Sequence, residues 1–216
     1  MPDSASLQIH RLDSGNPSQV AQWEAFVEQC PDATFFHRAG WQTVIRDVFR
    51  HETHFLYAEQ GGHVLGVLPL ARVHSRVFGH SLTGLPFTVY GGVAAIDEAA
   101  AHALEAEAQR IAQAAGVDHL ELRHVHRRHT DWPVQDLYVT FRKPILATEE
   151  ENMLAIPRKQ RAMVRKGIKN ALTSATDPNV DRFFALYADN VHRHGTPARP
   201  GLRGIAPGAA QFRRVA

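Results

Sequence analysis

The stretch HFLYAEQGGHVLGVLPLA, residues 54–71, determines the fold class that this chain is expected to adopt. Upstream of it the apolar residues recur with a helical period, whereas residues 54–59 and 63–71 have the pattern of β-strands. Gly61 and Gly62 stand between these two runs, where a tight hairpin turn needs positive φ. We therefore expect an antiparallel hairpin here, with helices before it.

Two helices are predicted before the hairpin, at residues 19–29 and 39–49. Ser18 is the expected N-cap of the first, and Cys30 with Pro31 marks its end. In each helix the large apolar side chains share one face: Val20, Trp23, Phe26 and Val27 in the first, and Trp41, Val44, Ile45, Val48 and Phe49 in the second. Both helices should therefore pack on the sheet through that face.

After the hairpin, helices and strands mix without a regular alternation. A long Ala-rich helix at 97–115 has Asp97 or a residue next to it as its expected N-cap and Gly116 at its end. The other expected elements are an irregular sheet edge at 72–78, a loop at 81–93 with room for a short strand at 87–90, strands at 119–123 and 137–141 with a polar loop at 124–133 between them, and helices at 149–155, 157–170 and 181–194. This order predicts an α/β fold with a mixed sheet and helices on both faces.

Composition excludes several classes of protein. The chain has 216 residues and one cysteine, Cys30, so an intramolecular disulfide framework is excluded. No apolar run reaches the roughly 20 residues of a membrane span, and the first residues do not resemble a signal peptide. We therefore expect a cytoplasmic protein without a membrane span.

Charge is distributed unevenly along the chain. Residues 1–147 hold 12 Lys and Arg against 16 Asp and Glu, whereas residues 148–216 hold 12 against 6. Such asymmetry indicates an anionic partner for the basic part, although an ordinary solvated surface would give the same pattern.

The basic part centres on the helix at 157–170, PRKQRAMVRKGIKN, which contains no acid. Pro157 suits its first position, because proline has no N–H to satisfy there. At about 100° per residue, the cations cover roughly one half of the helix: Arg158, Lys159, Arg161, Arg165, Lys166 and Lys169. Like charges four residues apart repel one another, so we expect these cations to meet phosphates, a nucleic-acid backbone or acids elsewhere in the protein. Plain solvation is the alternative.

The loop at 81–93, SLTGLPFTVYGGV, is the second candidate site. Gly84, Gly91 and Gly92 would let the backbone approach a ligand closely, and Thr83 and Tyr90 offer hydroxyl groups. The alternative is an ordinary turn region at a sheet edge. Elsewhere, the histidines at 124, 126 and 129 have no cysteine or acid at metal-ligand spacing, so no metal site is expected.

Several stretches resemble FemAB-like proteins, in particular the branch associated with PEP-CTERM and exopolysaccharide systems. They occur in order over roughly residues 20–197: Ala33-Thr34-Phe35-Phe36-His37 with Trp41, Gly66-Val67-Leu68-Pro69-Leu70, Ser75 with Phe78-Gly79, Leu85-Pro86-Phe87 with Tyr90-Gly91-Gly92, Leu120-Glu121-Leu122-Arg123, Ile156-Pro157 through Gly167, and Gly195-Thr196-Pro197. The proline-led basic segment and the LPF…YGG loop are the most specific of these.

The resemblance implies a protein of two GNAT-like domains that transfers acyl or aminoacyl groups to amines. This chain matches the first domain, expected at 1–147, and the helices at 148–196 that lead to a second domain. Residues 197–216 have no periodic pattern, and we expect them to be a disordered or out-of-frame tail that truncates the protein. The donor substrate would be acyl-CoA or aminoacyl-tRNA, with no tightly bound cofactor.

The function predicted on this basis is a fragment of a FemAB-like N-acyltransferase or aminoacyltransferase, acting on an amine of a cell-envelope or exopolysaccharide precursor. The expected partners are that anionic substrate and, through the donor, tRNA. The substrate-binding residues would be Tyr90, Gly91, Gly92, Arg158, Lys159, Arg161, Arg165 and Lys166. Two alternatives remain open: a non-catalytic module that binds anions or nucleic acid, and an inactive truncated product. The sequence indicates neither a catalytic base nor an oligomeric state.

Overall fold

The computed structural model describes residues 6–75, 79–177 and 179–195. The chain divides into two compact units, one with residues 1–128 and the segment from Asp181 onward, the other with residues 129–180. Below, the described residues up to 128 are called the sheet unit and residues 129–180 the helical unit. The predicted domain boundary at 147 stays a prediction.

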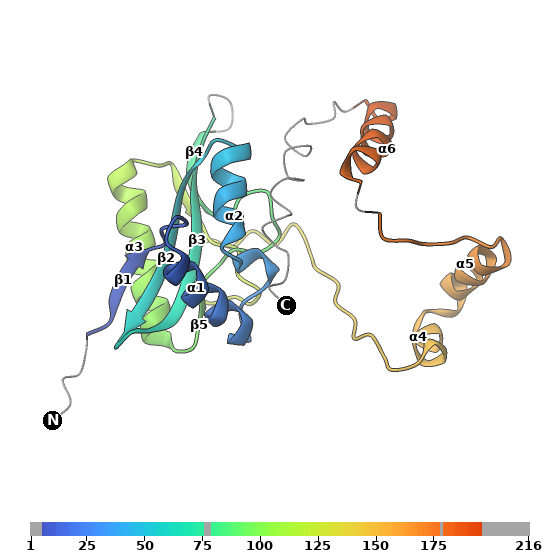
Figure 1. The fold of residues 1–216 in the computed structure, drawn as a ribbon, viewed down its shortest axis with the longest axis horizontal. Helices are drawn as coiled ribbons and strands as arrows, with labels where there is room; N and C mark the ends of the chain where they lie inside the picture. The colour runs from blue at the N-terminus through green and yellow to red at the C-terminus, as the bar shows by residue number, and fades with distance from the viewer. Residues whose placement is uncertain (1–5, 76–78, 178, 196–216) are drawn as a thin grey trace. The chain divides into compact units, whose positions relative to one another are not determined.

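A six-stranded mixed sheet forms the centre of the sheet unit (Figure 1). Its strands are β1 (Gln8–Arg11), β2 (Glu52–Gln60), β3 (His63–Ser75), β4 (Gly79–Gly84), β5 (Ala94–Ala95) and β6 (His119–Glu121). The order across the sheet is β1-β2-β3-β4-β6, and β5 also pairs with β3. The pairs are antiparallel, except that β4 and β6 form the one parallel pair among the described strands.

The central hairpin is confirmed. In the pairing of β2 with β3, Glu52 lies opposite Arg72 at one end and Gln60 opposite His63 at the other. Gly61 and Gly62 make the turn, with φ values of +58° and +82°. Successive side chains of β2 point to opposite faces, so Phe55 joins one core cluster and Leu56 the other.

Helices cover both faces of the sheet. On one face lie α1 (Pro17–Gln29), the short helix η1 (Phe35–His37), α2 (Gly40–Thr43) and the π-helical turn η2 (Val44–Val48). On the other face lies α3 (Glu98–Ala115). Trp23 and Ile45 pack in the first core, and Leu104 and Leu68 in the second. The predicted α/β class, with a mixed sheet and helices on both faces, is therefore confirmed.

The ends of the helices follow from their capping residues. Asn16, not Ser18 as predicted, caps α1, because its side-chain oxygen accepts from the backbone N–H of Ser18 at 3.1 Å and Gln19 at 3.3 Å. Asp97 caps α3 as predicted, with Oδ1 at 2.7 Å from the N–H of Ala100, and Gly116 ends that helix at φ +60°.

Two expectations about strands are wrong. Residues 81–84 belong to strand β4, which lies between β3 and β6, whereas a loop was expected, and no strand forms at 87–90. The glycine and threonine in this segment are typical of loops, so the sequence pattern did not indicate a strand. In the structure Leu82 and Gly84 are buried within β4. The strand expected at 137–141 is also absent from the described structure, and Leu137, Val139 and Phe141 are exposed. The alternation there has no neighbouring strand to pair with, so the pattern alone does not produce a strand.

Other elements differ less from expectation. β1 was not predicted, and β3 runs on to Ser75, while residues 76–78 lie outside the described residues. The helical unit contains α4 (Glu149–Ala155) and α5 (Arg158–Lys169), with Pro157 as the N-cap of α5, one position before the one predicted. α6 spans Val180–Arg193. The predicted tail, 197–216, falls outside the described residues. No described helix has the length and apolar character needed to cross a membrane.

Candidate functional site

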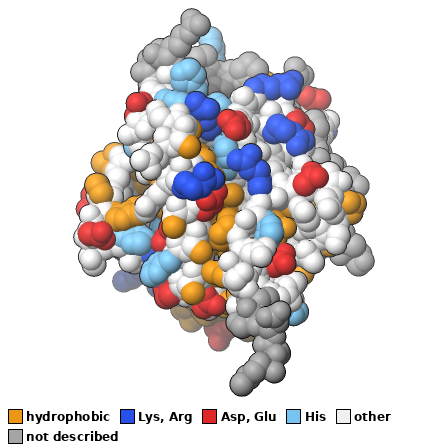
Figure 2. Space-filling model, turned by 90° about the vertical axis from the view of Figure 1, so that its left-hand side faces the viewer, with side chains coloured by type: hydrophobic (Ala, Val, Ile, Leu, Met, Phe, Trp, Pro, Cys, Tyr) orange, Lys and Arg blue, Asp and Glu red, His pale blue; other side chains and the backbone are white. Residues whose placement is uncertain are grey.

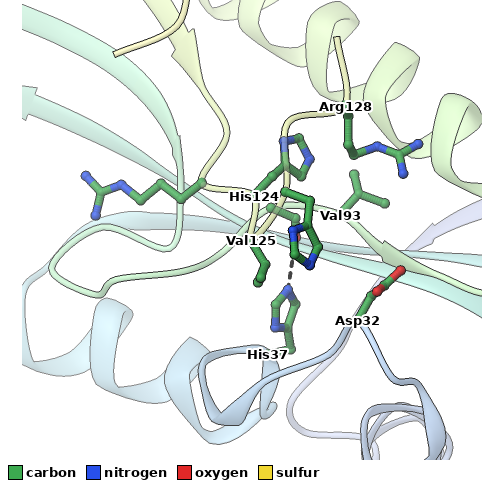
Figure 3. A pocket seen from close by; sticks show the side chains of 9 residues that line it. Asp32, His37, Val93, His124, Val125 and Arg128 are labelled. Carbon is green, nitrogen blue, oxygen red and sulfur yellow. Dashed lines mark hydrogen bonds between the residues drawn. The ribbon is translucent and has the colours of Figure 1, made fainter. Parts of the chain in front are cut away.

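A candidate site lies where the parallel strands β4 and β6 end. The two strands pair from Ser81–His119 to Thr83–Glu121, and the chain then leaves both of them at the same edge of the sheet. In mixed and parallel sheets this edge is the usual place for a ligand, because polar loops converge there. A pocket of about 60 Å³ lies at this edge (Figure 3), lined by Asp32, His37, Gly92, Val93, Arg123, His124, Val125, His126 and Arg128.

The β4–β5 loop, residues 85–93, borders this pocket and leaves the sheet at a proline. Strands β4 and β5 both pair with β3, so this loop is an excursion between two segments that lie along the same edge of β3. Leu85 N–H donates to the carbonyl of Pro69 at 2.9 Å, but Pro69 has no N–H to return. The hydroxyl of Thr88 lies 2.8 Å from the carbonyl oxygens of both Leu85 and Tyr90, so its one proton is shared between these two acceptors. The proline thus favours the departure of the loop at this point.

Close packing of the backbone fixes the base of the β4–β5 loop. A Cβ on Gly84 would overlap the carbonyl oxygen of Gly91, and one on Gly92 would lie 2.8 Å from Cγ of His124. The N–H groups of Gly91 and Gly92 both donate to the carbonyl of Arg123, at 3.1 and 3.0 Å. The glycines therefore permit close contacts within the protein, and their backbone N–H groups already have acceptors. A contact of Gly91 or Gly92 with a ligand stays a prediction.

The same loop holds two residues in strained backbone conformations. Leu85 has φ +40° and Phe87 φ +69°, in the left-handed region that residues with a Cβ avoid. Leu85 is fully buried, whereas Phe87 is about half exposed and stacks on Phe49 with ring centroids 4.2 Å apart. Strain of about 1–3 kcal/mol per residue persists only where the surroundings enforce it, and it occurs preferentially at functional sites.

His37 connects η1 to the end of this loop. Its Nδ1 accepts from the backbone N–H of Thr34 at 3.0 Å, so the ring proton must be on Nε2, which donates to the carbonyl of Gly92 at 3.0 Å. Burial lowers the pKa of His37, because the charged form would lose its hydration. His37 is therefore a neutral structural residue of the pocket wall and not a proton acceptor.

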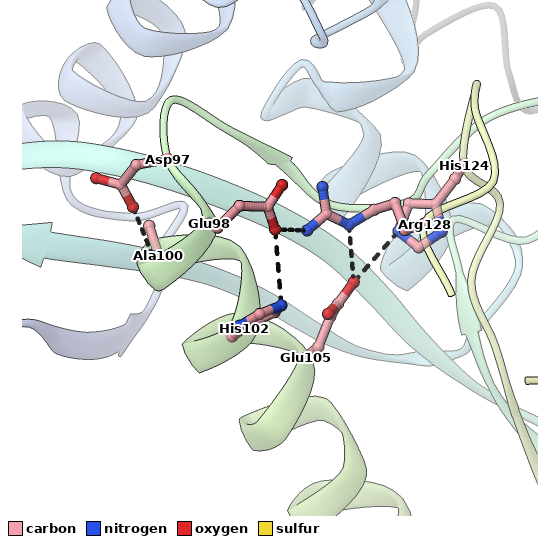
Figure 4. Close-up of polar contacts among 7 residues, drawn as sticks. All are labelled: Asp97, Glu98, Ala100, His102, Glu105, His124 and Arg128. Carbon is pink, nitrogen blue, oxygen red and sulfur yellow. Dashed lines mark hydrogen bonds and ion pairs between the residues drawn. The ribbon is translucent and has the colours of Figure 1, made fainter. Parts of the chain in front are cut away.

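A buried carboxylate holds the other side of the pocket (Figure 4). Glu105 of α3 is only 3% exposed, and its Oε1 lies 3.1 Å from Nε of Arg128 and 3.7 Å from Nε2 of His124. Arg128 also pairs with Glu98 at 2.7 Å. Glu105 thereby positions an arginine and a histidine at the pocket, and the positive charge of Arg128 compensates its burial.

Arg123 completes the cationic lining. Its Nε donates to Glu121 at 2.6 Å, and its Nη1 donates to the carbonyl of Thr88 in the β4–β5 loop at 2.7 Å. Asp32 is the one acid among the lining residues, and each lining arginine is held by an acid beside the pocket, Arg123 by Glu121 and Arg128 by Glu98 and Glu105. The arrangement suits a small anionic group such as a carboxylate or phosphate, because about 60 Å³ is far below the several hundred Å³ of a site that encloses a whole cofactor.

The structure brings some of the predicted site residues together and leaves others apart. Tyr90, Gly91 and Gly92 lie in the β4–β5 loop, where the Tyr90 ring packs 6.3 Å from that of Phe36. Thr83 is buried in β4, with its hydroxyl 3.0 Å from that of Ser81. Sequence reasoning missed His37, Glu105, Arg123 and Arg128. Glu105 had a readable signal, because it lies among the apolar positions of α3 that face the core.

The predicted basic residues lie on α5 in the helical unit: Arg158, Lys159, Arg161, Arg165 and Lys166, with Lys169. None of the six forms an ion pair with a described residue of that unit, although three acids of α4, Glu149 to Glu151, precede them in the chain. The alternative of internal ion pairing is therefore not realised within the helical unit. On the face of the sheet unit shown in Figure 2, by contrast, cationic and acidic side chains are interspersed.

Comparison with known proteins adds likenesses of fold only. No protein-family model and no curated protein matches the chain. Similar solved structures include a GNAT family acetyltransferase from Staphylococcus aureus, with 9% identity, a TM-score of 0.41, and coverage of 65% of this chain and 99% of that one. An aminoglycoside N-acetyltransferase in complex with CoA has 14% identity, a TM-score of 0.44 and coverage of 67% and 99%. A transcriptional regulator from Bacillus halodurans has 10% identity, a TM-score of 0.39, and coverage of 65% of this chain and 100% of that one. Such values carry no inference about family or activity.

Proposed function

We propose that this chain is the acceptor-side part of a FemAB-like N-acyltransferase or aminoacyltransferase with a GNAT-like domain, acting on an amine of a cell-envelope or exopolysaccharide precursor. The observation that carries the proposal is the pocket lined by arginine and histidine at the ends of β4 and β6, bordered by the strained β4–β5 loop. Activated sugar precursors carry phosphate groups, and arginine with histidine binds such groups well. The proposed donor is acyl-CoA or aminoacyl-tRNA.

Transfer to an amine imposes three requirements on such a site. The acceptor must be held in place, its amine must lose a proton, and charge developing on the acyl oxygen must be stabilised. Arg123 and Arg128 meet the first requirement by holding an anionic group of the acceptor. Of the histidines that line the pocket, His124 and His126 are the candidates to receive the proton, since His37 is committed to structural hydrogen bonds.

The proposal is tested by titrating the isotope-labelled chain with three sugars and following its NMR spectrum. Glucosamine 6-phosphate has both the amine and the anion, whereas glucosamine lacks the phosphate and glucose 6-phosphate lacks the amine. We expect glucosamine 6-phosphate to shift the amide signals of Gly92, His124 and His126 at the lowest concentration. His126→Gln should weaken its binding about tenfold, the effect of losing one charge-assisted hydrogen bond.

A matched control is His63→Gln, which changes an exposed histidine at the start of β3, outside the pocket. It should leave the binding unchanged. If none of the three sugars shifts the pocket signals, or if both histidine variants weaken binding equally, the acceptor role of this pocket is excluded.

A non-catalytic module that binds anions or nucleic acid is the second candidate function, and the cations of α5 favour it. Neutralising six phosphates would make RNA affinity fall about 300-fold between 50 and 200 mM salt. Fluorescence anisotropy with a 20-nucleotide RNA measures this dependence. An affinity that does not change with salt, or does not change in Arg161→Glu with Arg165→Glu, would rule this function out.

A further inference from the structure

Helix α5 exposes two chemically different faces. Its six cations, defined here as the basic face, cover roughly one half of the helix, and they have no ion-pair partner among the described residues of the helical unit. Repulsion between Arg161 and Arg165, and between Arg165 and Lys169, is therefore uncompensated there. An external anionic surface would remove this cost.

The other half of α5 carries three exposed apolar side chains next to Gln160 and Gly167. Met163 is 68% exposed and Ile168 66%, and Val164 lies beside them on the same half. The chain after the helix adds to this half, because Leu172 turns back over Gly167: its N–H donates to the Gly167 carbonyl at 3.2 Å. These four side chains, Met163, Val164, Ile168 and Leu172, are defined as the apolar face.

We propose that α5 lies in the surface of an anionic lipid bilayer, with the basic face toward lipid phosphates and the apolar face in the outermost acyl region. A basic amphipathic helix with both faces exposed fits this partner. A nucleic acid would satisfy the basic face alone and leave the apolar face in water. The inference does not depend on the acyltransferase proposal.

The dimensions of α5 fit a helix that lies in the bilayer surface. Its 12 residues span about 18 Å, well short of the roughly 30 Å hydrocarbon core, so the helix cannot cross the bilayer. Arg161 and Lys159 flank the apolar face, and their long side chains can extend to the headgroups while their methylene groups stay in the apolar region. Four apolar side chains provide little insertion, so binding requires anionic lipid and weakens with salt.

The acids of α4 set a limit on this attraction. Glu149, Glu150 and Glu151 form the first turn of that helix, where Thr148 caps it and pairs with Glu151 at 3.0 Å. The helix dipole stabilises these carboxylates at the N-terminus of α4, so they do not need the cations of α5 as partners. Three carboxylates against six cations leave a positive excess for the bilayer.

The test uses the full chain with vesicles of phosphatidylcholine alone or mixed equally with phosphatidylglycerol. We expect cosedimentation with the mixed vesicles only, and its loss in high salt. Arg161→Glu with Arg165→Glu should lower the affinity about 30-fold or more, since each cation near the surface contributes about fivefold. Circular dichroism of this double variant checks that its helical content is unchanged.

A second pair of variants separates a bilayer from a nucleic acid. Met163→Gln with Ile168→Gln should lower affinity for the mixed vesicles about tenfold and leave binding to a 20-nucleotide RNA unchanged. Leu137→Gln with Val139→Gln removes exposed apolar side chains of the same unit outside α5 and should change neither. Equal binding to both vesicle types, no binding to either, or unaltered vesicle affinity in Met163→Gln with Ile168→Gln overturns the inference, as does RNA binding that is tighter than binding to the mixed vesicles.

Discussion

In the sheet unit the charges next to the candidate pocket occur in pairs, whereas on α5 six cations occur without a described partner in their unit. Glu105 is almost fully buried and is compensated by the charge of Arg128. No described residue of α4, α5 or α6 is buried. The difference teaches that burial forces charges to pair, because an unpaired buried charge costs several kcal/mol, while exposed charges remain available to a partner.

The same contrast applies to glycine. In the sheet unit Gly84 and Gly91 permit backbone segments to touch, whereas a Cβ on Gly167 of α5 would make only an ordinary van der Waals contact with a side chain. Glycine is thus required by packing in one region and merely tolerated in the other. Substitutions at these positions measure how different the two regions are.

The largest expected effect comes from Gly84→Ala. The new methyl group would overlap the backbone carbonyl of Gly91, which cannot move without breaking the hydrogen bonds of Gly91 and Gly92 to Arg123. We expect a loss of about 3 kcal/mol in the free energy of unfolding, measured in urea. A loss below about 0.5 kcal/mol would show that the base of the β4–β5 loop is not closely packed.

Glu105→Gln should have the next largest effect. It removes the charge that compensates Arg128 at a buried position, with an expected loss of about 2–3 kcal/mol. The control is Glu107→Gln on the same helix, where the carboxylate pairs with Arg110 at 2.7 Å near the surface. That variant should lose less than about 1 kcal/mol. Equal losses would contradict the contrast between buried and exposed charges.

Acid should destabilise the sheet unit through its neutral histidines. Burial lowers the pKa of His37, and burial together with the Arg11 charge lowers that of His54. The unfolded chain therefore binds these protons more readily, so stability is complete above the unfolded pKa of about 6.5 and falls as the pH drops below it. The slope is at most about 1.4 kcal/mol per pH unit for each histidine.

Urea unfolding between pH 5 and 7.5 measures this dependence, and His37→Gln should reduce its slope. A stability that rises toward pH 5, or a slope that His37→Gln leaves unchanged, would refute the neutral assignment of His37.

The smallest expected effect is that of Gly167→Ala. Alanine favours a helix over glycine by about 1 kcal/mol, and the nearest atom to the new Cβ is a Leu172 methyl group at 3.5 Å. The helix content by circular dichroism should rise slightly, and the unfolding of the sheet unit should not change. A decrease in helix content would indicate that α5 is packed more closely than its exposure shows.

Local patterns in the sequence were sufficient for much of the fold. The Gly61-Gly62 turn, the Asp97 cap and the Gly116 end of α3 depend on residues next to one another in the chain, and all are found as predicted. The N-cap of α1 was misplaced by two residues, since Asn16 and Ser18 are both good caps and only the geometry distinguishes them. A prediction from neighbouring residues succeeds where the interactions are local.

Tertiary structure alone decided the rest. β4 is a strand because β3 and β6 flank it, despite a composition typical of loops. Glu105 meets Arg128 and His124 across about 20 residues, and His37 meets Gly92 across 55, so the pocket exists only in the folded chain. By itself the sequence determined the mixed α/β class and the basic face of α5, because both follow from the spacing of apolar and charged residues within short segments. The pocket was decided by contacts between distant segments, which no local pattern encodes.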